Sequence, residues 1–277
     1  MREKRFKVED PARSAYISEM HPTYDAAPNS GHSSHHAVAR LRTARLAASA
    51  KPFLARGSGG GRCPDCRLAV SHCLCALRPT VPTRSGVCLI MGDIEALKPS
   101  NTGWLVADVV GDTSAFPWSR TAVDPGLLAL LADPQWQPYV VFPGEFADAE
   151  RVVDEVAPQT LDKLGKRPLF VLLDGTWSEA RKMFRKSPYL DALPVLSLKP
   201  DLVSNYRLRR SSRDDHFCTS EVAALCLALA GETHAADTLA AYLDVFSERY
   251  LSVKRNLRLD VESEAHQRLH ALECAPA

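Results

Sequence analysis

The chain has 277 residues, 45% of them apolar, so it can bury the core of one large domain or two small ones. Lys and Arg (34) nearly balance Asp and Glu (33), so the net charge does not indicate a polyanionic partner and any basic surface must be local. The opening MREKRFKVEDPARS lacks the apolar stretch of a signal peptide, and no later run approaches the roughly 18 apolar residues of a membrane span, so we expect a globular, cytoplasmic protein without a membrane segment.

Residues 1–60 are rich in Ala, Ser, His and Arg and end in RGSGGGR, a composition typical of a flexible N-terminal extension. One helix is predicted within it, around residues 36–50. The tract HSSHH (His32, His35, His36) has no acidic or thiol partner nearby in the sequence. We therefore interpret it as a solvated tract rather than a metal site.

The segment RCPDCRLAVSHCLCALRP carries four cysteines in a C-x2-C-x6-C-x-C array: Cys63, Cys66, Cys73 and Cys75. In a reducing compartment such clustering indicates metal ligation rather than disulfides. Zinc takes four thiolates at tetrahedral corners, and this array implies no open ligand position. Residues 61–80 are therefore predicted to hold a structural zinc, with four unrelated thiols as the alternative.

From about residue 85, short apolar runs alternate with helical segments, which predicts an α/β fold with a mainly parallel sheet and helices on both faces. The first of two closing helices is nearly all apolar and is expected to pack on the sheet. The expected catalytic domain covers 81–260, followed by a C-terminal tail at 261–277. The alternating segments, in chain order, are GVCLIMG, NTGWLVADVV, PYVVFPG, PLFVLLDG, a basic helix and LPVLSL, and the closing helices are TSEVAALCLALAG and HAADTLAAYLDVFSERYLSVKRN.

The stretch LFVLLDGTWSEARKMFRKSPYL, residues 169–190, predicts a strand, an Asp-Gly turn and a basic helix. Thr176 and Glu179 match the capping-box pattern T-x-x-E, which leaves Asp174 unexplained. Asp174 follows an apolar run, and ligands bind at the carboxyl ends of strands in open α/β sheets. Without further information, a turn-forming residue and a catalytic acid are equal interpretations of Asp174.

Two clusters of cations flank this region. Arg181, Lys182, Arg185 and Lys186 form two adjacent rows at i, i+4 spacing, and NYRLRRSSR adds Arg207, Arg209, Arg210 and Arg213 before the closing helices. Such runs usually form a solvated face. Two of them beside one candidate site, in a chain without excess charge, favour a phosphate-binding track.

The cysteine array is followed in order by ALKPSNTG, FPGE, D-x-T-W-x-x-A-R and CTSEVA. Over roughly residues 62–255 this set resembles the DTW-domain family of tRNA-uridine aminocarboxypropyltransferases. The resemblance implies a fold related to the SPOUT superfamily, in which knotted chains and homodimers are common. Where the family leads us to expect an Arg after NTG, this chain has Trp104, which replaces a phosphate contact with a stacking surface.

The resemblance implies transfer of the 3-amino-3-carboxypropyl group of S-adenosylmethionine to N3 of a tRNA uridine, giving acp3U and methylthioadenosine. Alkylation at N3 needs a base, and Asp174 is the candidate, with Thr176 and Trp177 beside it in the catalytic motif. Trp177 is expected either to stack on a base or to anchor the core, and Thr176 to cap the helix first. The residues expected to bind the donor, with a generic turn and a helix cap as alternatives, are Phe142, Pro143, Gly144, Thr219, Ser220, Glu221, Asn101 and Thr102.

Two other functions are compatible with the same residues. A SPOUT-type RNA methyltransferase would use S-adenosylmethionine but move its methyl group. A zinc-bearing RNA-binding protein without chemistry would bind tRNA independently of S-adenosylmethionine.

Overall fold

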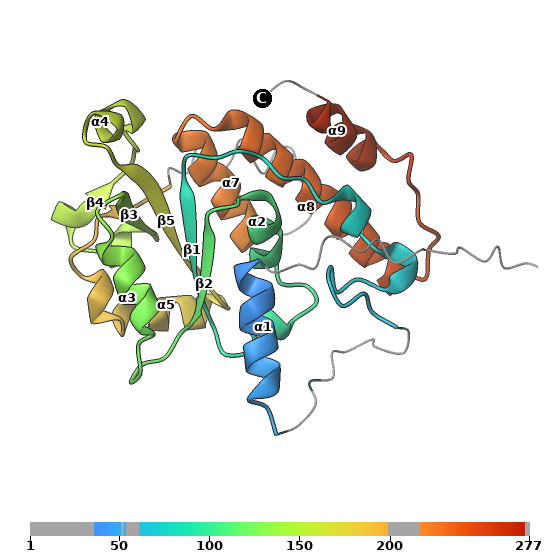
Figure 1. The fold of residues 1–277 in the computed structure, drawn as a ribbon, viewed down its shortest axis with the longest axis horizontal. Helices are drawn as coiled ribbons and strands as arrows, with labels where there is room; N and C mark the ends of the chain where they lie inside the picture. The colour runs from blue at the N-terminus through green and yellow to red at the C-terminus, as the bar shows by residue number, and fades with distance from the viewer. Residues whose placement is uncertain (1–35, 51–52, 54–60, 199–216, 275–277) are drawn as a thin grey trace, which may run out of the picture. The chain divides into compact units, whose positions relative to one another are not determined.

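The computed structural model describes residues 36–50, 53, 61–198 and 217–274 (Figure 1). The expected contacts of Arg207, Arg209, Arg210 and Arg213, and most of the HSSHH tract, lie outside these ranges. The knot and the homodimer also stay predictions.

Six strands form one sheet in the order β2-β1-β5-β3-β6-β4, and each described pairing is parallel. Every residue of β1 is buried, as expected for a parallel strand covered on both faces. β5 lies between β1 and β3, which places its last residue, Asp174, next to the end of β1. The strands are β1 (Gly86–Met91), β2 (Thr113–Pro117), β3 (Trp136–Val141), β4 (Val152–Val153), β5 (Arg167–Asp174) and β6 (Val195–Leu196).

Helices cover both faces of the sheet, as the sequence predicted (Figure 1). Alternate side chains of β5 point to opposite faces. Phe170 and Leu172 join the core beneath α2 (Gly103–Val109), α7 (Thr219–Leu229) and α8 (Thr233–Lys254). Leu169 and Val171 join the core beneath α3 (Pro125–Ala132) and α5 (Trp177–Arg185). The nearly all-apolar α7 packs against β5, which confirms its expected position on the sheet.

Both ends of the described chain depart from their expected roles. Helix α1 (Ala37–Ala47) begins at the N-cap His36 and buries Val38 completely, so it belongs to the core instead of a flexible extension. Helix α9 (Glu264–Glu273) lies within the expected tail and packs on α8 through the buried Leu269. In the described ranges, none of the helices combines the length and apolarity that crossing a bilayer requires.

Shorter helical elements complete the described chain. Helix α4 (Pro158–Lys163) precedes β5. Single turns of 3-10 helix occur at Val70–His72, Cys75–Leu77, Glu95–Leu97, Gly144–Phe146, Ala149–Arg151 and Pro188–Leu190.

Candidate functional site

Three of the sequence motifs meet at Asp174, the last residue of β5. Its carboxylate is buried, with the residue only 4% exposed. Oδ2 accepts a hydrogen bond of 2.7 Å from the Asn101 amide, and Oδ1 accepts one of 2.6 Å from the Thr219 hydroxyl. The motifs NTG, DGTW and CTSEVA, far apart in sequence, therefore converge on one carboxyl group.

Burial raises the pKa of Asp174, while the hydrogen bonds from Thr219 and Asn101 and the positive charge of Lys98 oppose the rise. An ionised carboxylate only accepts hydrogen bonds, so the Thr219 hydroxyl must donate to it. The Thr219 oxygen then offers its lone pairs to a further donor.

Close packing around Asp174 depends on a glycine. A Cβ on Gly103 would lie 2.7 Å from Asp174 Oδ2, closer than real Cβ contacts. The backbone N–H of Trp104 donates to Asn101 Oδ1 at 3.2 Å, which fixes the amide so that its NH₂ group faces Asp174. The first turn of α2 and the end of β5 therefore form one hydrogen-bonded unit.

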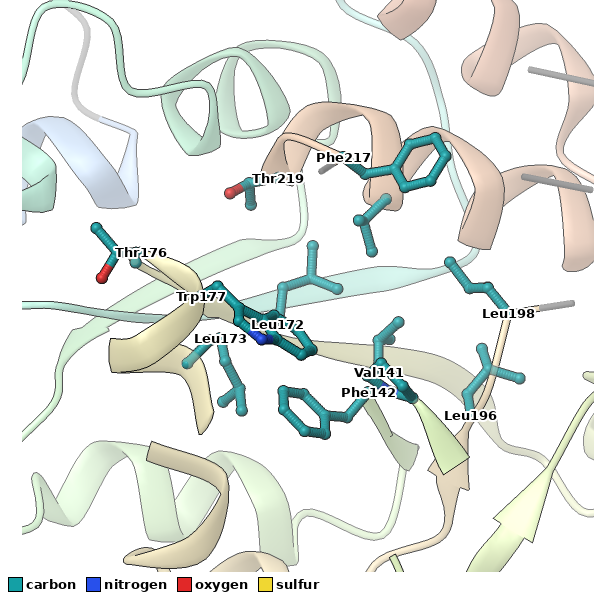
Figure 2. A pocket seen from close by; sticks show the side chains of 14 residues that line it. Val141, Phe142, Leu172, Leu173, Thr176, Trp177, Leu196, Leu198, Phe217 and Thr219 are labelled. Carbon is teal, nitrogen blue, oxygen red and sulfur yellow. The ribbon is translucent and has the colours of Figure 1, made fainter. Parts of the chain in front are cut away.

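A cleft of about 780 Å³ opens at the carboxyl ends of β3, β5 and β6, three neighbouring strands. This is the edge at which ligands bind in open α/β sheets. Figure 2 shows Thr176 and Thr219 toward one side of the cleft and the apolar Leu196 and Leu198 toward the other. The lining residues are Val141, Phe142, Pro143, Leu172, Leu173, Gly175, Thr176, Trp177, Ala180, Leu196, Leu198, Phe217, Thr219 and Val222.

Aromatic rings form one wall of the cleft. Phe142 lies nearly parallel to Phe184, with centroids 4.4 Å apart, and nearly parallel to Trp177 at 5.4 Å. Phe146 meets the Trp177 ring edge-on at 5.8 Å. Trp177 is 40% exposed, so this stack anchors its ring while leaving part of the indole accessible.

Some predicted donor ligands line the cleft and others support it. Phe142, Pro143 and Thr219 are lining residues. Gly144 instead packs against neighbouring chain: its N–H donates to Ser197 Oγ at 3.0 Å, and a Cβ there would lie 2.9 Å from Val152 Cγ1. Gly144, which was expected to bind the donor, therefore lets neighbouring chain segments pack closely.

The start of α7 is also more occupied than the sequence indicated. The Ser220 N–H donates to Thr102 Oγ1 at 3.3 Å, and the Cys218 N–H donates to the Glu221 carboxylate at 2.8 Å. These two backbone amide groups therefore have protein partners and follow the alternative of a helix cap. Ser220 and Thr102 join α7 to the α2 loop, whereas Glu221 caps the start of its own helix.

At the start of α5 the predicted capping box is present. Thr176 Oγ1 accepts from the Glu179 N–H at 3.4 Å, and the Glu179 carboxylate accepts from the Thr176 N–H at 2.8 Å. This cap directs Thr176 and Trp177 to the mouth of the cleft.

The stacking surface expected at Trp104 is wrong. Trp104 is 1% exposed, and its ring packs between the Arg67 guanidinium at 4.0 Å and the edge-on ring of His36 at 4.6 Å. No face of this indole is open to a nucleobase.

The cations of α5 begin at the cleft wall and continue away from it. The Arg181 guanidinium lies 4.8 Å from the centroid of the Phe146 ring, and the Lys182 ammonium lies 5.4 Å from that of Trp118. Lys182, Arg185 and Lys186 are exposed. The arrangement allows a polyanion to reach the cleft along this helix.

The four clustered cysteines converge as predicted. Their sulfur atoms lie within 4.8 Å of one another, with Cys63 at 3.6 Å from Cys73 and from Cys75, and Cys66 at 3.8 Å from Cys73. A tetrahedral zinc with Zn–S bonds of about 2.3 Å separates its sulfurs by about 3.8 Å. The Leu74 N–H also donates to Cys66 Sγ at 3.3 Å, as amides do to thiolates. The cluster can therefore bind a metal, and its spacing fits zinc.

Sequence reasoning missed several residues of the site. Leu198 and Val222 line the cleft from within LPVLSL and CTSEVA, and Phe217 lines it from just before CTSEVA, but nothing in the pattern indicated that their side chains face one cleft. Arg67 reaches the NTG loop from the cysteine segment. Gly103 was visible within the NTG motif, where a glycine at a helix start indicates close approach of another group.

Comparison with known proteins agrees with this geometry. A family model described as "DTW domain" matches residues 60–251, more than half of the chain. Over 178 residues, 61% of this chain, the sequence is 27% identical to a Drosophila melanogaster protein named "tRNA-uridine aminocarboxypropyltransferase 2", and the chain spans 66% of that relative's length, just under two thirds. No solved structure matches the chain significantly. The family match extends from the cysteine cluster through the cleft to α8, and the chain therefore belongs to the DTW domain family.

Proposed function

We propose that this protein transfers the 3-amino-3-carboxypropyl group of S-adenosylmethionine to N3 of a uridine in tRNA. The observation that carries the proposal is that Asp174, held by Asn101, accepts a hydrogen bond from Thr219, which lines a cleft on the carboxyl edge of the sheet. Membership of the DTW domain family and the name of the Drosophila relative support the choice of reaction.

The donor is proposed to bind along the cleft. Its adenosyl group takes the apolar part near Leu196 and Leu198, and its aminocarboxypropyl end lies toward Thr219. Transfer of this group instead of the methyl requires the donor's Cγ, and not its methyl carbon, to be held against the nucleophile in a near-attack geometry. The placement of the donor in the cleft therefore decides the reaction.

In the proposed reaction, uridine N3 forms a bond to Cγ while the Cγ–S bond breaks, and the bonding pair stays on sulfur as methylthioadenosine leaves. The N3 proton passes to the Thr219 oxygen as the Thr219 hydroxyl proton passes to Asp174. The raised pKa makes Asp174 a stronger base than an exposed carboxylate. Trp177 is proposed to stack on the acceptor base, with Thr176 holding the helix start.

The tRNA backbone is proposed to follow Arg181, Lys182, Arg185 and Lys186, together with Arg207, Arg209 and Arg210. The four clustered cysteines are proposed to hold a structural zinc, which stabilises the fold and takes no part in the chemistry. None of the eight cysteines, all of which lie in the described ranges, forms a disulfide, and we propose that the protein works in the reducing cytoplasm.

The function is tested by incubating the protein with tRNA and S-adenosylmethionine and analysing the nucleosides by mass spectrometry. The expected product is the aminocarboxypropyl adduct of uridine together with methylthioadenosine. A methyl adduct would instead identify a methyltransferase. Binding of tRNA that is indifferent to S-adenosylmethionine, with neither adduct formed, would identify an RNA-binding protein.

Asp174→Asn tests the base. The amide oxygen still accepts from Asn101, but its NH₂ group must donate to Thr219, which reverses that bond. The single-turnover rate should fall by about 10² to 10⁴, the usual contribution of a positioned base, while calorimetry finds donor affinity unchanged. If only donor affinity falls, Asp174 is a donor ligand, and if neither changes, the assignment is wrong.

A further inference from the structure

Arg67 is an unusual residue of the cysteine segment, because it follows the ligand Cys66 directly and yet points away from the sulfur atoms. It is buried, at 2% exposure, with a left-handed backbone (φ 66°). Its guanidinium donates to the carbonyl of Lys98 at 2.9 Å and, through two nitrogens at 3.4 Å each, to the carbonyl of Asn101. The guanidinium plane also covers the Trp104 ring at 4.0 Å.

We propose that Arg67 is a positioning residue that couples the metal-binding segment to Asp174. Arg67 holds the Asn101 backbone, and the Asn101 side chain donates to Asp174 Oδ2 at 2.7 Å. Two steps of hydrogen bonding therefore join the residue beside a metal ligand to the proposed base.

An arginine suits this position because its planar fork can donate to two carbonyls and stack on an indole at the same time. Burial lowers the pKa of Arg67, and the charges of Asp108 and Cys66 oppose that shift. The cation is thus kept in the interior by carbonyl dipoles, an aromatic face and nearby negative charge.

The backbone of Arg67 is held by the turn that carries the first two cysteines. The Arg67 N–H donates to the Cys63 carbonyl at 3.0 Å, and the Cys63 N–H donates to the Leu68 carbonyl at 2.8 Å. A metal held by Cys63 and Cys66 would close this turn and so support Arg67 in a backbone conformation that most residues avoid. Metal loading would then reach the NTG loop through one side chain.

Arg249 provides a matched control. It is also buried, at 5% exposure, and also touches the cysteine segment, since it donates to the Cys73 carbonyl. Its other partner is His266 Nε2 at 3.0 Å, on α9 and away from Asp174. Substitution of Arg249 removes a hydrogen bond between the cysteine segment and the rest of the fold but leaves the contacts of the NTG loop in place.

The experiment compares Arg67→Gly with Arg249→Met in the full chain. Glycine adopts the left-handed backbone without strain, so Arg67→Gly keeps the cysteine turn while it removes the whole side chain, guanidinium included. Metal content is checked by elemental analysis. Hydrogen exchange is measured in peptides spanning 101–106 and 172–176. Three kinetic measurements rest on the proposed function: the single-turnover rate, its pH profile and the donor KM.

For Arg67→Gly we expect the metal to be retained and hydrogen exchange to be faster in both peptides. The single-turnover rate should fall by on the order of 10²-fold, as for a reacting group displaced by about 1 Å. The pH profile of the rate should shift, and the donor KM should change little. Arg67→Lys, which keeps the charge and one donor group, should recover part of the rate. Arg249→Met should lower the unfolding midpoint but leave exchange, rate and pH profile as in the parent.

Parental exchange and rate in Arg67→Gly would overturn the proposal, as would equal changes in Arg249→Met. If Arg67→Gly loses its metal or does not fold, Arg67→Lys decides, because parental behaviour there also overturns the coupling. If the parent transfers no group, the proposed function fails, whereas hydrogen exchange still decides whether Arg67 controls the loop at Asp174.

Discussion

The hydrogen bonds of Asp174 reach beyond the Asp-Gly turn that was one of its two predicted roles. Its two carboxylate oxygens accept from residues 73 and 45 positions away, Asn101 and Thr219. A residue needed only for the Asp-Gly turn would bond to its own loop. The long-range partners show that Asp174 does more than form the turn, and the surrounding structure holds it in place despite the cost of burial, while its role as a base stays a proposal.

Gly103→Ala is expected to damage the site without touching a polar group. The added Cβ would lie 2.7 Å from Asp174 Oδ2 and 3.3 Å from Asn101 Oδ1, so the carboxylate must move. Overpacking of this kind costs about 1–3 kcal/mol of unfolding free energy, and displacement of the base should lower single-turnover transfer by at least tenfold. Denaturant unfolding and rapid-quench kinetics measure the two effects.

Gly111→Ala is the control, because a Cβ at Gly111 meets nothing within 4 Å. If Gly103→Ala transfers the group as fast as this control, the contact between α2 and Asp174 is looser than described.

At the residue scale, the sequence predicted the side chains that carry recognisable chemistry and missed those that position them. Asp174, Asn101 and Thr219 stood in motifs, and the four cysteines stood in an array. The contact between Arg67 and Asn101 joins positions 34 apart, and one sequence contains no signal for such a pairing. Trp104 was misinterpreted because its exposure depends on packing by Arg67 and His36.

At the scale of elements, most segments were predictable, including α1 within the helix predicted around residues 36–50 and the short β6 within LPVLSL, whereas β2 and β4 were not. β1, β3, β5, α7 and α8 lie where the apolar runs indicated. β2 escaped prediction because it is only partly buried and ends at Pro117, and β4 has two residues. The start of α3 does carry a signal, an Asp124 N-cap followed by Pro125 at the first helical position.

Neutralising the exposed end of the basic helix should weaken tRNA binding. In Arg185→Gln/Lys186→Gln, each phosphate group that the helix no longer neutralises should reduce the slope of log K against log salt by about 0.7 to 0.9. Donor affinity should stay the same, because neither residue lines the cleft. Filter binding over a salt series measures the slope.

Lys163→Gln/Lys166→Gln provides the matched control. These two lysines precede the first residue of β5, so they lie at the amino end of that strand, opposite the cleft. Equal salt slopes for the two double variants would mean that α5 presents only a solvated face.

Removal of two metal ligands tests the cysteine cluster. Cys63→Ser/Cys66→Ser should lose bound zinc and unfold at a lower temperature, because metal binding is coupled to folding. Elemental analysis and thermal unfolding measure the two losses. Cys274→Ser, at an exposed cysteine outside the cluster, should retain the parental metal content. Absence of metal in parent protein purified without chelator would contradict the assignment.

At the scale of the whole molecule, a buried ionisable pair links three helices. His36 at the start of α1 lies 3.4 Å from the carboxylate of Asp108 in α2, and Tyr242 of α8 donates to that carboxylate at 3.1 Å. Burial lowers the pKa of His36 to about 3, aided by Arg78, and burial raises the pKa of Asp108 to about 6 against the charge of Arg78. Burial therefore disfavours the charged form of both groups, while the Arg78 guanidinium, 2.8 Å from Asp108 Oδ1, stabilises the ionised carboxylate.

The two groups should have opposite effects on the pH dependence of stability. Between about pH 4 and 6 the unfolded His36 gains a proton that the folded one lacks, so its contribution to unfolding free energy rises with pH. The folded Asp108 keeps a proton that the unfolded one has lost, so its contribution falls with pH. Each slope is about 1.4 kcal/mol per pH unit, and the two cancel in the parent.

Urea unfolding of single variants should separate these slopes. His36→Asn keeps an N-cap acceptor and should lose stability, relative to the parent, as pH rises from about 4 to 6. Asp108→Asn should gain relative stability over the same window. Difference slopes of the same sign would show that the pair does not titrate as the structure indicates.

The aromatic wall of the cleft also allows ligand binding to be followed by intrinsic tryptophan fluorescence. Of the four tryptophans, Trp104 and Trp136 are buried, whereas Trp177 is 40% exposed and stacked on Phe142 at the cleft. Iodide should therefore quench the emission of Trp177 more than that of the two buried indoles. A ligand that enters the cleft should protect this emission, so occupancy can be followed by fluorescence without labelling either the donor or the RNA.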